Sequence, residues 1–517
     1  MKKNILLLWL LLLFPACAVN PVTGERELAI INESQELAIG SKQYRPSRQS
    51  QGGDYVADPE LVAYVQEVGS RLANVSDRKL PYEFVVINSS IPNAWALPGG
   101  KIAINRGLLL ELESEGELAA VLGHEIVHAA ARHSARGIER GILLQGVTMA
   151  TSVAIKKSAY AGYSDIAIKG AGLATNLVTH KYGRDAERES DHYGMLYMER
   201  AGYDPREAIT LQETFVRLQK SANDSWLAGL FATHPPSKER VEENRKFSKE
   251  LKQGGYIGRE KFEKMIARLK RAEPAYKAYE AGVEALHGKK YIQAKKLAQK
   301  AIEIEPAEGL FYALLGDVQL QEGDKEAAAI SYDRAILANP DFFLLFEKRG
   351  KLRQLTGDRS GASADMKKAA ALFPTVNSYL ALGSFAEKDG DRAKAIKYYR
   401  DAAQSDSEKG RLAEKSLVRL DLSSNPNQYL KAHFVLDSDG NLLVSVKNPT
   451  PIAVDNVTVV VMFTDAVGQL KNLPLSFSRE INPGQSQTVV SGISGVDGRL
   501  LRKNGFKVVV TKAGIYK

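Results

Sequence analysis

The chain has 517 residues, a formal net charge of +9, 44% hydrophobic and 25% charged residues. This length is too great for a single hydrophobic core and predicts about three domains. Basic residues are scattered, without runs or interleaved aromatics, which argues against a nucleic-acid partner and favours an ordinary solvated surface. The most apolar stretch after the N-terminus, Gly141 to Ile155, is shorter than the roughly 20 residues that a transmembrane helix needs.

The N-terminus has the pattern of a targeting segment. Two lysines precede the apolar run Ile5 to Phe14, which predicts a signal peptide over residues 1–16. Cys17 is the only cysteine, so the chain makes no internal disulfide. Its position resembles the lipobox of bacterial lipoproteins, and Ala18 in place of Asp would then direct the protein to the outer membrane. The alternative is an ordinary signal peptide with an incidental cysteine, which would leave the protein soluble in the periplasm.

The next segments introduce a mixed α+β domain over residues 58–273. Residues 17–57 are mostly polar and predict an N-terminal linker, with compact structure starting near Asp58. Apolar residues at helical spacing then precede two strand-like runs: Leu61, Val65, Val68 and Leu72, followed by Tyr82 to Ile87 and Lys101 to Asn105.

A helix is predicted from Ser114, because Ser114 with Glu117 three residues later forms a capping-box pattern. This helix is apolar on most faces and is therefore expected to be buried. Three polar residues within it, His124, Glu125 and His128, need partners there.

His124-Glu125-Ile126-Val127-His128 is an HExxH motif. Its two histidines are four positions apart and share one helix face, so both imidazoles can reach a single zinc ion. Glu125 can then face a water molecule at that metal and act as general base. By itself the motif is also compatible with two satisfied histidines in a hydrophobic core.

A second acidic pair follows on a helical stretch over residues 184–218. Glu187 can complete a His-His-Glu zinc site, and Asp191, four positions later, can accept the outer ring proton of a metal-bound histidine, for which we favour His124. The alternatives are that Glu189 is the ligand, or that this charged run is a solvated helix face.

Several segments, in this order, resemble the gluzincin peptidases of metallopeptidase family forty-eight, which includes HtpX, the CAAX prenyl endopeptidases and periplasmic proteases of the BepA type. The matching segments are Asn20 to Gly24, Asn93 to Gly100, Gly123 to His128 with Arg132-His133, the Glu187/Asp191 segment, and Thr233 to Pro236.

The resemblance implies further roles. His234 is similar to the family's additional active-site histidine, which either stabilises an oxyanion or occupies the open zinc position; the plain alternative is a loop histidine. Arg240 corresponds to the basic residue after that motif. The segment Asn93, Ala94 and Trp95 corresponds to an edge strand that pairs with substrate backbone.

Three further positions need comment. His133 also matches the family, and we interpret it as structural. Gly183 stands where the family usually has Ser, and Ser190 where it usually has Ala; both residues are small, so no effect on the metal site is expected.

Residues 274–408 predict about four tetratricopeptide repeats. Small residues and prolines recur every 34 positions, as expected for paired helices that touch closely: Gly282, Gly316 and Gly350; Ala294, Ala328 and Ala362; Ala301, Ala335 and Ala369; Pro306, Pro340 and Pro374. An irregular helical bundle is the alternative. Such a stack presents a concave groove for a protein partner. Residues 409–424 are expected to be a linker.

Residues 425–517 contain strand-like Val-rich runs punctuated by Asp-Gly and Asn-Pro turns, which predict a C-terminal β-sandwich. The segment carries no catalytic constellation, so binding or packing is the default role.

Together these patterns predict a zinc-dependent endopeptidase with one Zn²⁺ per chain. We expect it to be lipid-anchored at Cys17 on the periplasmic side of the outer membrane, where it cleaves misfolded or misassembled envelope proteins captured by its repeats. Two alternatives belong to other classes: an outer-membrane assembly chaperone whose zinc site is blocked by His234, and a passive scaffold with incidental zinc.

Overall fold

The computed structural model describes residues 17–144, 182–221, 234–235, 237–465, 467–494 and 505–516. These residues form two compact units that divide between Phe373 and Pro374. The predicted signal peptide, and most of the apolar stretch that follows Gly141, lie outside the described residues. Within the described part, no helix has the length and apolar character needed to cross a bilayer.

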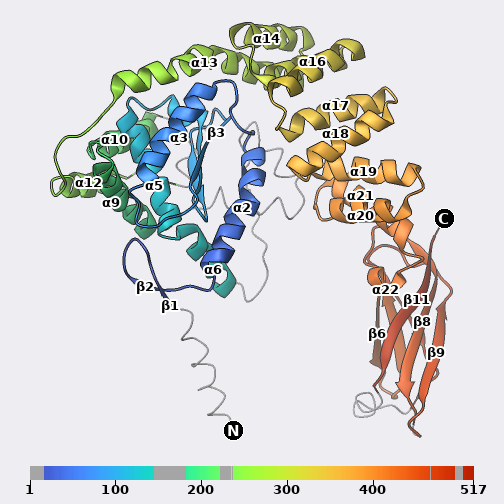
Figure 1. The fold of residues 1–517 in the computed structure, drawn as a ribbon. Helices are drawn as coiled ribbons and strands as arrows, with labels where there is room; N and C mark the ends of the chain where they lie inside the picture. Colours follow the sequence, from blue (N-terminus) through green and yellow to red (C-terminus); the bar gives the residue numbers. More distant parts are fainter. Residues whose placement is uncertain are drawn as a thin grey trace, which may run out of the picture. The chain divides into compact units, whose positions relative to one another are not determined.

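The first unit begins with an α+β domain (Figure 1). Its elements in chain order are β1 (Cys17–Val19), β2 (Arg26–Leu28), α2 (Glu33–Ser50), α3 (Pro59–Ala73), β3 (Glu83–Ile87), β4 (Ala94–Leu97), β5 (Lys101–Asn105), α4 (Arg106–Leu109), α5 (Glu115–Ala130), α6 (His133–Leu144), α9 (Arg184–Arg200), α10 (Glu207–Ser221) and α12 (Lys238–Phe247).

A three-stranded sheet of order β3-β5-β4 forms the centre of this domain. β3 and β5 are parallel, β4 pairs with β5 in the antiparallel sense, and both predicted strands are found. One face of the sheet carries Trp95 and Leu97 and packs on Tyr44 of α2. The opposite face carries Phe84, which packs against Gly69 of α3. Alternation of side chains along each strand separates the two faces, and Figure 1 shows α2 and α3 on either side of β3.

The domain starts earlier than the expected boundary at Asp58. β1 and β2 form an antiparallel pair, and α2 has a full capping box between Asn32 and Gln35. The sequence pattern hid α2 because few of its buried residues are apolar. The carboxylate of Glu36, which is fully buried, accepts hydrogen bonds from the guanidinium groups of Arg78 and Arg132 instead.

α5 is a buried helix that begins as predicted. The Ser114 hydroxyl accepts a hydrogen bond from the backbone N–H of Glu117 at 3.0 Å. The second half of the capping box differs, because the Glu117 carboxylate accepts from the N–H of Glu113 at 2.6 Å instead of from Ser114. In α5 the side chain of His124 is half-buried, while the other residues of the helix are buried.

The helical repeats follow this domain. The repeat helices of the first unit are α13 (Arg259–His287), α14 (Tyr291–Ile304), α15 (Gly309–Gln321), α16 (Lys325–Ala338), α17 (Phe343–Leu355) and α18 (Arg359–Leu372). Ala294, Ala328 and Ala362 are fully buried between paired helices, as their spacing indicates. At Gly316 a Cβ atom would lie only 2.7 Å from the Tyr332 ring, so the close helix contact requires glycine.

At the predicted domain boundary, residues 273/274, the chain has no break, because α13 runs through it. The repeats are also fastened to the α+β domain. Gln49 at the end of α2 donates to the carbonyl of Asp341 at 2.7 Å and accepts from the N–H of Phe343 at 2.9 Å. Asn88, after β3, donates to the Glu308 carboxylate at 2.9 Å.

The second unit holds the last repeat helices, α19 (Val376–Lys388), α20 (Arg392–Ala402) and α21 (Glu408–Asp421), then α22 (Pro426–Tyr429). The predicted linker over residues 409–424 is therefore wrong. α21 extends the stack because its buried residues Ala413 and Leu417 pack in one cluster with Tyr399 of α20. Its surface is mostly charged, which made it resemble a linker in the sequence.

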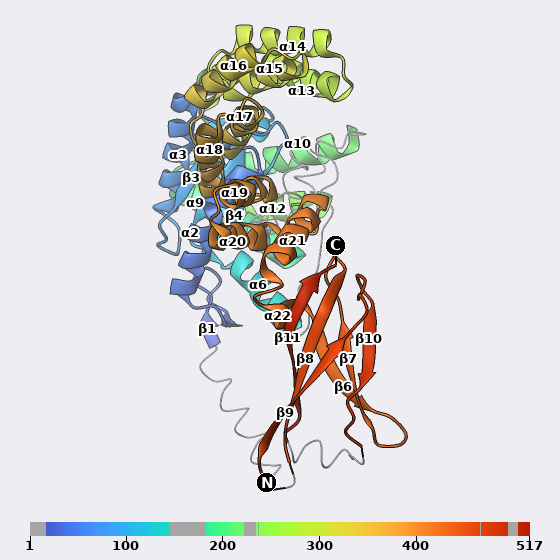
Figure 2. The same cartoon turned by 90° about the vertical axis from the view of Figure 1, so that its right-hand side faces the viewer.

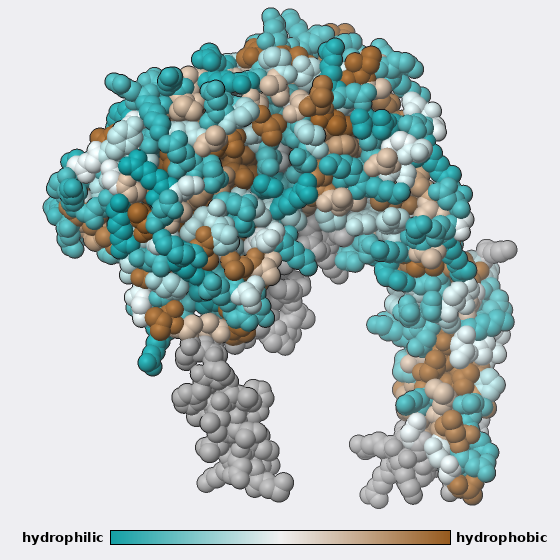
Figure 3. Space-filling view, in the orientation of Figure 1, coloured by the Kyte–Doolittle hydropathy of each residue, from teal (hydrophilic) through white to brown (hydrophobic). Residues whose placement is uncertain are grey.

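Two three-stranded antiparallel sheets end the chain (Figure 2). Their orders are β10-β7-β6 and β11-β8-β9, with bounds β6 (Lys431–Leu436), β7 (Leu442–Lys447), β8 (Val454–Thr464), β9 (Leu470–Phe477), β10 (Ser486–Val490) and β11 (Lys507–Ile515). Buried valines of both sheets, such as Val444 and Val459, belong to one hydrophobic cluster. Hydrophobic residues also reach the surface of this unit (Figure 3), among them Leu470 and Val490.

Candidate metal centre

α5 brings two imidazoles to one point. The Nε2 atoms of His124 and His128 lie 3.1 Å apart, because residues four positions apart share a helix face. His128 is fully buried and Glu125 is 2% exposed. Glu125, one residue after His124, is directed to the same side of the cluster as His234, whose Nε2 lies 3.6 Å from Glu125 Oε1.

α9 supplies the third member of the cluster. Glu187 Oε2 lies 3.6 Å from His124 Nε2, and Glu187 Oε1 lies 3.5 Å from His128 Nε2. The two helices approach closely through a glycine pair. A Cβ atom at Gly123 would lie 3.3 Å from the carbonyl oxygen of Gly194, and one at Gly194 would lie 3.2 Å from the backbone nitrogen of His124.

His234 and Arg240 complete the inner arrangement. His234 Nδ1 lies 3.0 Å from Glu187 Oε1, and its ring centroid is 5.3 Å from those of both His124 and His128. Arg240 of α12 donates from Nη1 to Glu187 Oε2 at 2.8 Å. Its Nε and Nη2 donate to the two oxygens of Asp191, each at 2.7 Å, while Asp191 Oδ1 lies 3.1 Å from His124 Nδ1.

The electrostatics of the cluster favour a positive charge at its centre. Burial raises the pKa of Glu125 and lowers the pKa of His128 well below its usual value, so that imidazole is neutral. Burial alone would also raise the pKa of Glu187, but the charge of His234 and hydrogen bonds from the histidines hold it well below the usual range. Burial opposes charge on His234, yet the carboxylates of Glu187 and Glu125 raise its pKa to about 9.

These residues fit a metal ion. Two ligands of a tetrahedral zinc lie about 3.3 Å apart when the bonds are about 2.0–2.1 Å long. The two imidazole Nε2 atoms are 3.1 Å apart, and each lies 3.5–3.6 Å from one oxygen of Glu187, His128 from Oε1 and His124 from Oε2. Among the described residues, His124, His128, Glu187 and His234 form one group able to hold a metal. Two buried atoms of the centre, Glu125 Oε2 and His234 Nε2, have no hydrogen-bond partner in the described part of the chain.

Three residues around the centre were missed or underestimated in the sequence. The ring of Tyr182 stacks on that of His128 at a centroid distance of 3.8 Å. His133, which we had interpreted as merely structural, places Nδ1 2.7 Å from His128 Nδ1. Its Nε2 lies 2.8 Å from Glu189 Oε2, so Glu189 faces His133 and is outside the metal group. The matching Arg132-His133 segment was the available signal for His133, and nothing in the sequence marked Tyr182.

The strand that was predicted to receive substrate is at the sheet edge. β4 begins at Ala94 and pairs only with β5 within the described sheet, while Asn93 directly precedes it. The carbonyl of Ala96 accepts hydrogen bonds from the hydroxyls of Ser134 and Tyr182, at 3.1 and 3.2 Å. This carbonyl therefore points away from β5, and Ala94, two positions earlier, has the same orientation.

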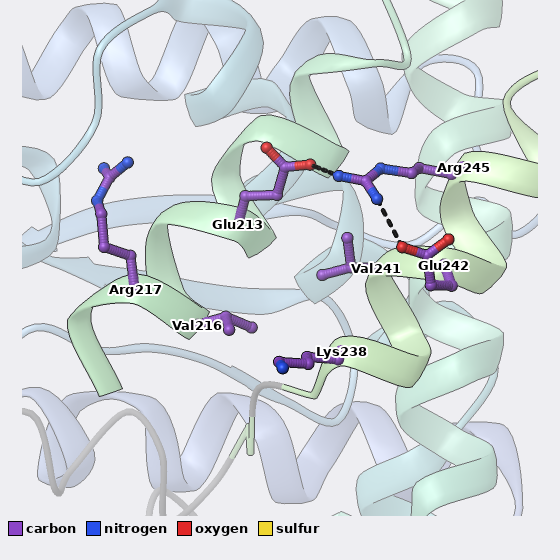
Figure 4. Close-up of a pocket in the computed structure, with 7 residues that line it drawn as sticks. All are labelled: Glu213, Val216, Arg217, Lys238, Val241, Glu242 and Arg245. Atoms are coloured by element: carbon purple, nitrogen blue, oxygen red, sulfur yellow. Dashed lines mark hydrogen bonds and ion pairs between the residues drawn. The ribbon is translucent and has the colours of Figure 1, made fainter. Parts of the chain in front are cut away.

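Two of the hollows in this domain bear on the position of the site. A small, mainly apolar cavity of about 60 Å³ adjoins the centre and is lined by His124, Glu125 and His234 together with Met195, Leu211 and Phe215. A larger hollow of about 590 Å³ lies between α10 and α12 (Figure 4). There Arg245 bridges Glu213 and Glu242, and no residue of the metal group lines it, so size alone does not locate the chemistry.

An HExxH helix and a carboxylate from a later helix, brought together beside a small mixed sheet, are typical of a metallopeptidase. A family model described as "Peptidase family M48" matches residues 59–247, and a tetratricopeptide-repeat model matches residues 311–342 and 376–409. The chain thus carries a peptidase domain of family M48 together with tetratricopeptide repeats.

Named relatives align with part of the chain. The chain is 28% identical to a beta-barrel assembly-enhancing protease of Yersinia pestis, over 62% of this chain and 70% of that protein. The protein of the same name in Escherichia coli is 24% identical, over 60% of this chain and 68% of its own. The mitochondrial metalloendopeptidase OMA1 of Arabidopsis thaliana is 35% identical, over 31% of this chain and 30% of its own.

Proposed function

We propose that this protein is a zinc endopeptidase that hydrolyses peptide bonds of misfolded or misassembled cell-envelope proteins. His124, His128 and Glu187 would hold one Zn²⁺, since two imidazoles and a carboxylate are a donor set typical of catalytic zinc. The observation that carries the proposal is the convergence of these three side chains from two helices, with the Glu125 carboxylate beside them.

Glu125 is placed to act as general base. When bound, zinc supplies Lewis-acid chemistry: it lowers the pKa of a water molecule towards about 7 and polarises a carbonyl. The carboxylate of Glu125 would accept a proton from such a water molecule and return it to the leaving amine. Its raised pKa, caused by burial, brings it nearer to the working pH of such a proton carrier. Its free oxygen Oε2 is the atom available for this transfer.

Arg240 and Asp191 would support this work without touching the substrate. Asp191 accepts the Nδ1 proton of His124, which directs the lone pair of His124 Nε2 to the metal. Arg240 donates to both Asp191 and Glu187, which are buried, and its positive charge offsets part of their negative charge. Without the positive charge of Arg240, burying these two carboxylates so close together would be costly.

β4 is our candidate for the substrate strand. The backbone of Ala94 faces the open side of the sheet, and an extended polypeptide can add to such an edge through main-chain hydrogen bonds. The carbonyl of Ala96 is already engaged by Ser134 and Tyr182, and that of Asn93 accepts from the N–H of Asn105. Within the segment Asn93, Ala94 and Trp95, pairing would therefore centre on the backbone of Ala94. This binding mode recognises the substrate through its backbone, so it suits unfolded clients that differ in sequence.

We also propose a location and partners for the protein. The relatives named as assembly-enhancing proteases motivate a role at the outer membrane. β1 begins at Cys17, so a lipid on that residue would tether the peptidase domain directly. The repeats would capture clients or a protein partner, and the two C-terminal sheets, which share one hydrophobic cluster, would form a β-sandwich with a binding or packing role.

Replacing Glu125 with Gln tests the catalytic role. We expect zinc to stay bound while cleavage of an unfolded envelope protein falls by at least about 100-fold, the usual size of a lost general base. Glu117→Gln is the matched control, because Glu117 is a buried carboxyl at the opposite end of the same helix. Cleavage by the Glu125 variant at the wild-type rate would rule out the role, and clients retained by that variant in cells would identify substrates.

A second candidate function is an assembly chaperone with a self-inhibited zinc site. It is favoured by the 3.0 Å contact between His234 Nδ1 and Glu187 and by the burial of His234, which is 8% exposed. A His234→Ala variant separates the two functions. A gain in proteolysis would mean that His234 blocks the site, whereas a loss would mean that it serves catalysis, for example by stabilising an oxyanion.

A further inference from the structure

His133 and Glu189 form a hydrogen-bonded chain that ends on His128. α5 stops at Ala130, the backbone of Arg132 adopts a left-handed conformation at φ 61°, and α6 begins at His133. This turn brings the His133 ring against His128, with 2.7 Å between their Nδ1 atoms. On its other side, His133 Nε2 lies 2.8 Å from Glu189 Oε2, and Arg136 Nη2 donates to the same oxygen at 2.9 Å.

Counting protons along this chain fixes the tautomer of each ring. An ionised carboxylate only accepts hydrogen bonds, so the proton of a neutral His133 lies on Nε2 and points to Glu189. His133 Nδ1 is then an acceptor, and the proton between the two Nδ1 atoms belongs to His128. Because a neutral imidazole carries one proton, His128 Nε2 is left with a lone pair, and that atom faces His124 and Glu187.

The reverse arrangement is unfavourable. A proton on His133 Nδ1 would leave two acceptors facing each other at 2.8 Å, at Nε2 and the Glu189 carboxylate. It would also place the proton of His128 on Nε2, where no metal could bind. The Ser190 hydroxyl lies 3.4 Å from His133 Nδ1 and can donate a second hydrogen bond to it, which is compatible with that nitrogen being an acceptor.

We propose that Glu189 and His133 are positioning residues that set the tautomer of His128 and so prepare its Nε2 for the metal. The inference rests on the proposed function, because it assumes that His128 is a metal ligand. It gives a role to two residues that lie outside the metal group. Tyr182 fixes the plane of the same ring by stacking on it at an interplanar angle of 17°.

Zinc affinity of the purified full chain tests the proposal, measured by competition with a chelator, alongside the visible spectrum of the Co²⁺-loaded protein. Loss of an outer partner of a ligating histidine typically costs 10- to 100-fold in metal affinity. We expect losses of about that size for Glu189→Ala and for His133→Phe, which keeps the ring but removes both nitrogens. Glu189→Gln should recover part of the loss, since its amide oxygen still accepts from His133.

Controls separate positioning from general damage. Asp185→Ala removes an exposed carboxylate from the same helix and should leave the affinity within about twofold of wild type. The Glu189→Ala and His133→Phe losses should not add in the double variant, because both act through one chain of hydrogen bonds. Either loss should add to that of Asp191→Asn, which acts on His124 instead.

The outcomes are distinguishable. A wild-type chain that takes up no zinc would refute the proposed function itself. A wild-type chain that binds zinc tightly, with Glu189→Ala and Glu189→Gln unchanged, would refute the positioning role alone. The Glu189 side chain is 23% exposed, so its variants are expected to fold even if His133→Phe does not, and circular dichroism of each variant checks this. Additive losses in the double variant would also overturn the proposal.

Discussion

His124 and His128 lie one turn apart on α5 and face the same point, yet their outer nitrogens are held in different ways. A carboxylate, Asp191, contacts His124 directly, whereas Glu189 reaches His128 only through the ring of His133. Both carboxylates come from α9, but they are two positions apart and cannot face the same side of that helix. A third ring therefore bridges the gap on the His128 side.

The comparison shows that α9 can orient both His124 and His128, because an additional side chain, His133, connects its second carboxylate to His128. The direct arm is rigid and charged, because Arg240 donates to both oxygens of Asp191. In the indirect arm, Arg136 donates to one oxygen of Glu189, which is 23% exposed, while the His133 ring between Glu189 and His128 is 3% exposed. Four experiments test this contrast.

The largest effect is expected from removing a ligand itself. His128→Ala and His124→Ala should each weaken zinc binding by about 3–5 kcal/mol, roughly a third of the total for a protein zinc site. Chelator competition measures this, and His192→Ala, on α9 but outside the metal group, is the control. Similar losses of zinc affinity in the two variants would show that both histidines bind the same ion. A loss in only one variant would show that the other histidine is not a ligand.

Removing Arg240 should destabilise the fold of the metal-free protein. Arg240→Leu leaves the buried carboxylates of Asp191 and Glu187 without their cation, and breaking such a pair costs about 3–5 kcal/mol. Urea unfolding provides the measurement. Arg245→Leu on the same helix is the control and should cost at most about 1 kcal/mol, because its side chain is 48% exposed. Equal losses in the two variants would contradict a special role for the direct arm.

The direct arm should also make stability depend on pH. Although burial opposes it, Arg240 lowers the pKa of Asp191 from 3.8 to about 2. A depressed pKa contributes stability that is complete above about pH 4 and is lost as the pH falls towards about 2. Its size is about 2 kcal/mol at most. In urea unfolding of the metal-free protein, the gap between wild type and Asp191→Asn should narrow from pH 5 to pH 3; a constant gap would argue against this coupling.

The smallest effect is expected at Ser190. Its hydroxyl lies 3.4 Å from His133 Nδ1, which already accepts from His128, so the contact is long and redundant. Ser190→Ala should change the unfolding free energy by less than about 1 kcal/mol and zinc affinity by a few-fold at most. A loss as large as that of Glu189→Ala would mean that the hydroxyl, and not His128, supplies the proton to His133.

The sequence predicted secondary structure well where a local pattern, such as alternation, capping or repetition, specifies it. The strand at Lys101–Asn105 and the start of α5 at Ser114 follow from alternation and capping. The repeats follow from a 34-residue recurrence. The expected limits of segments differed from the structure where a helix buries polar residues or has a mostly charged surface. Glu36 made α2 look like a linker, and the charged surface of α21 concealed a helix that extends the stack.

The sequence alone determined the class of chemistry, because helical spacing puts His124 and His128 on one face whatever surrounds them. It also supplied Glu187 and Asp191 as candidates by the same periodicity. Three features are visible only in the tertiary structure. Glu189 contacts His133, and the Tyr182 ring stacks on His128. Gly123 and Gly194 allow α5 and α9 to approach closely. Periodicity describes a single helix, whereas these contacts depend on how separate helices and loops pack.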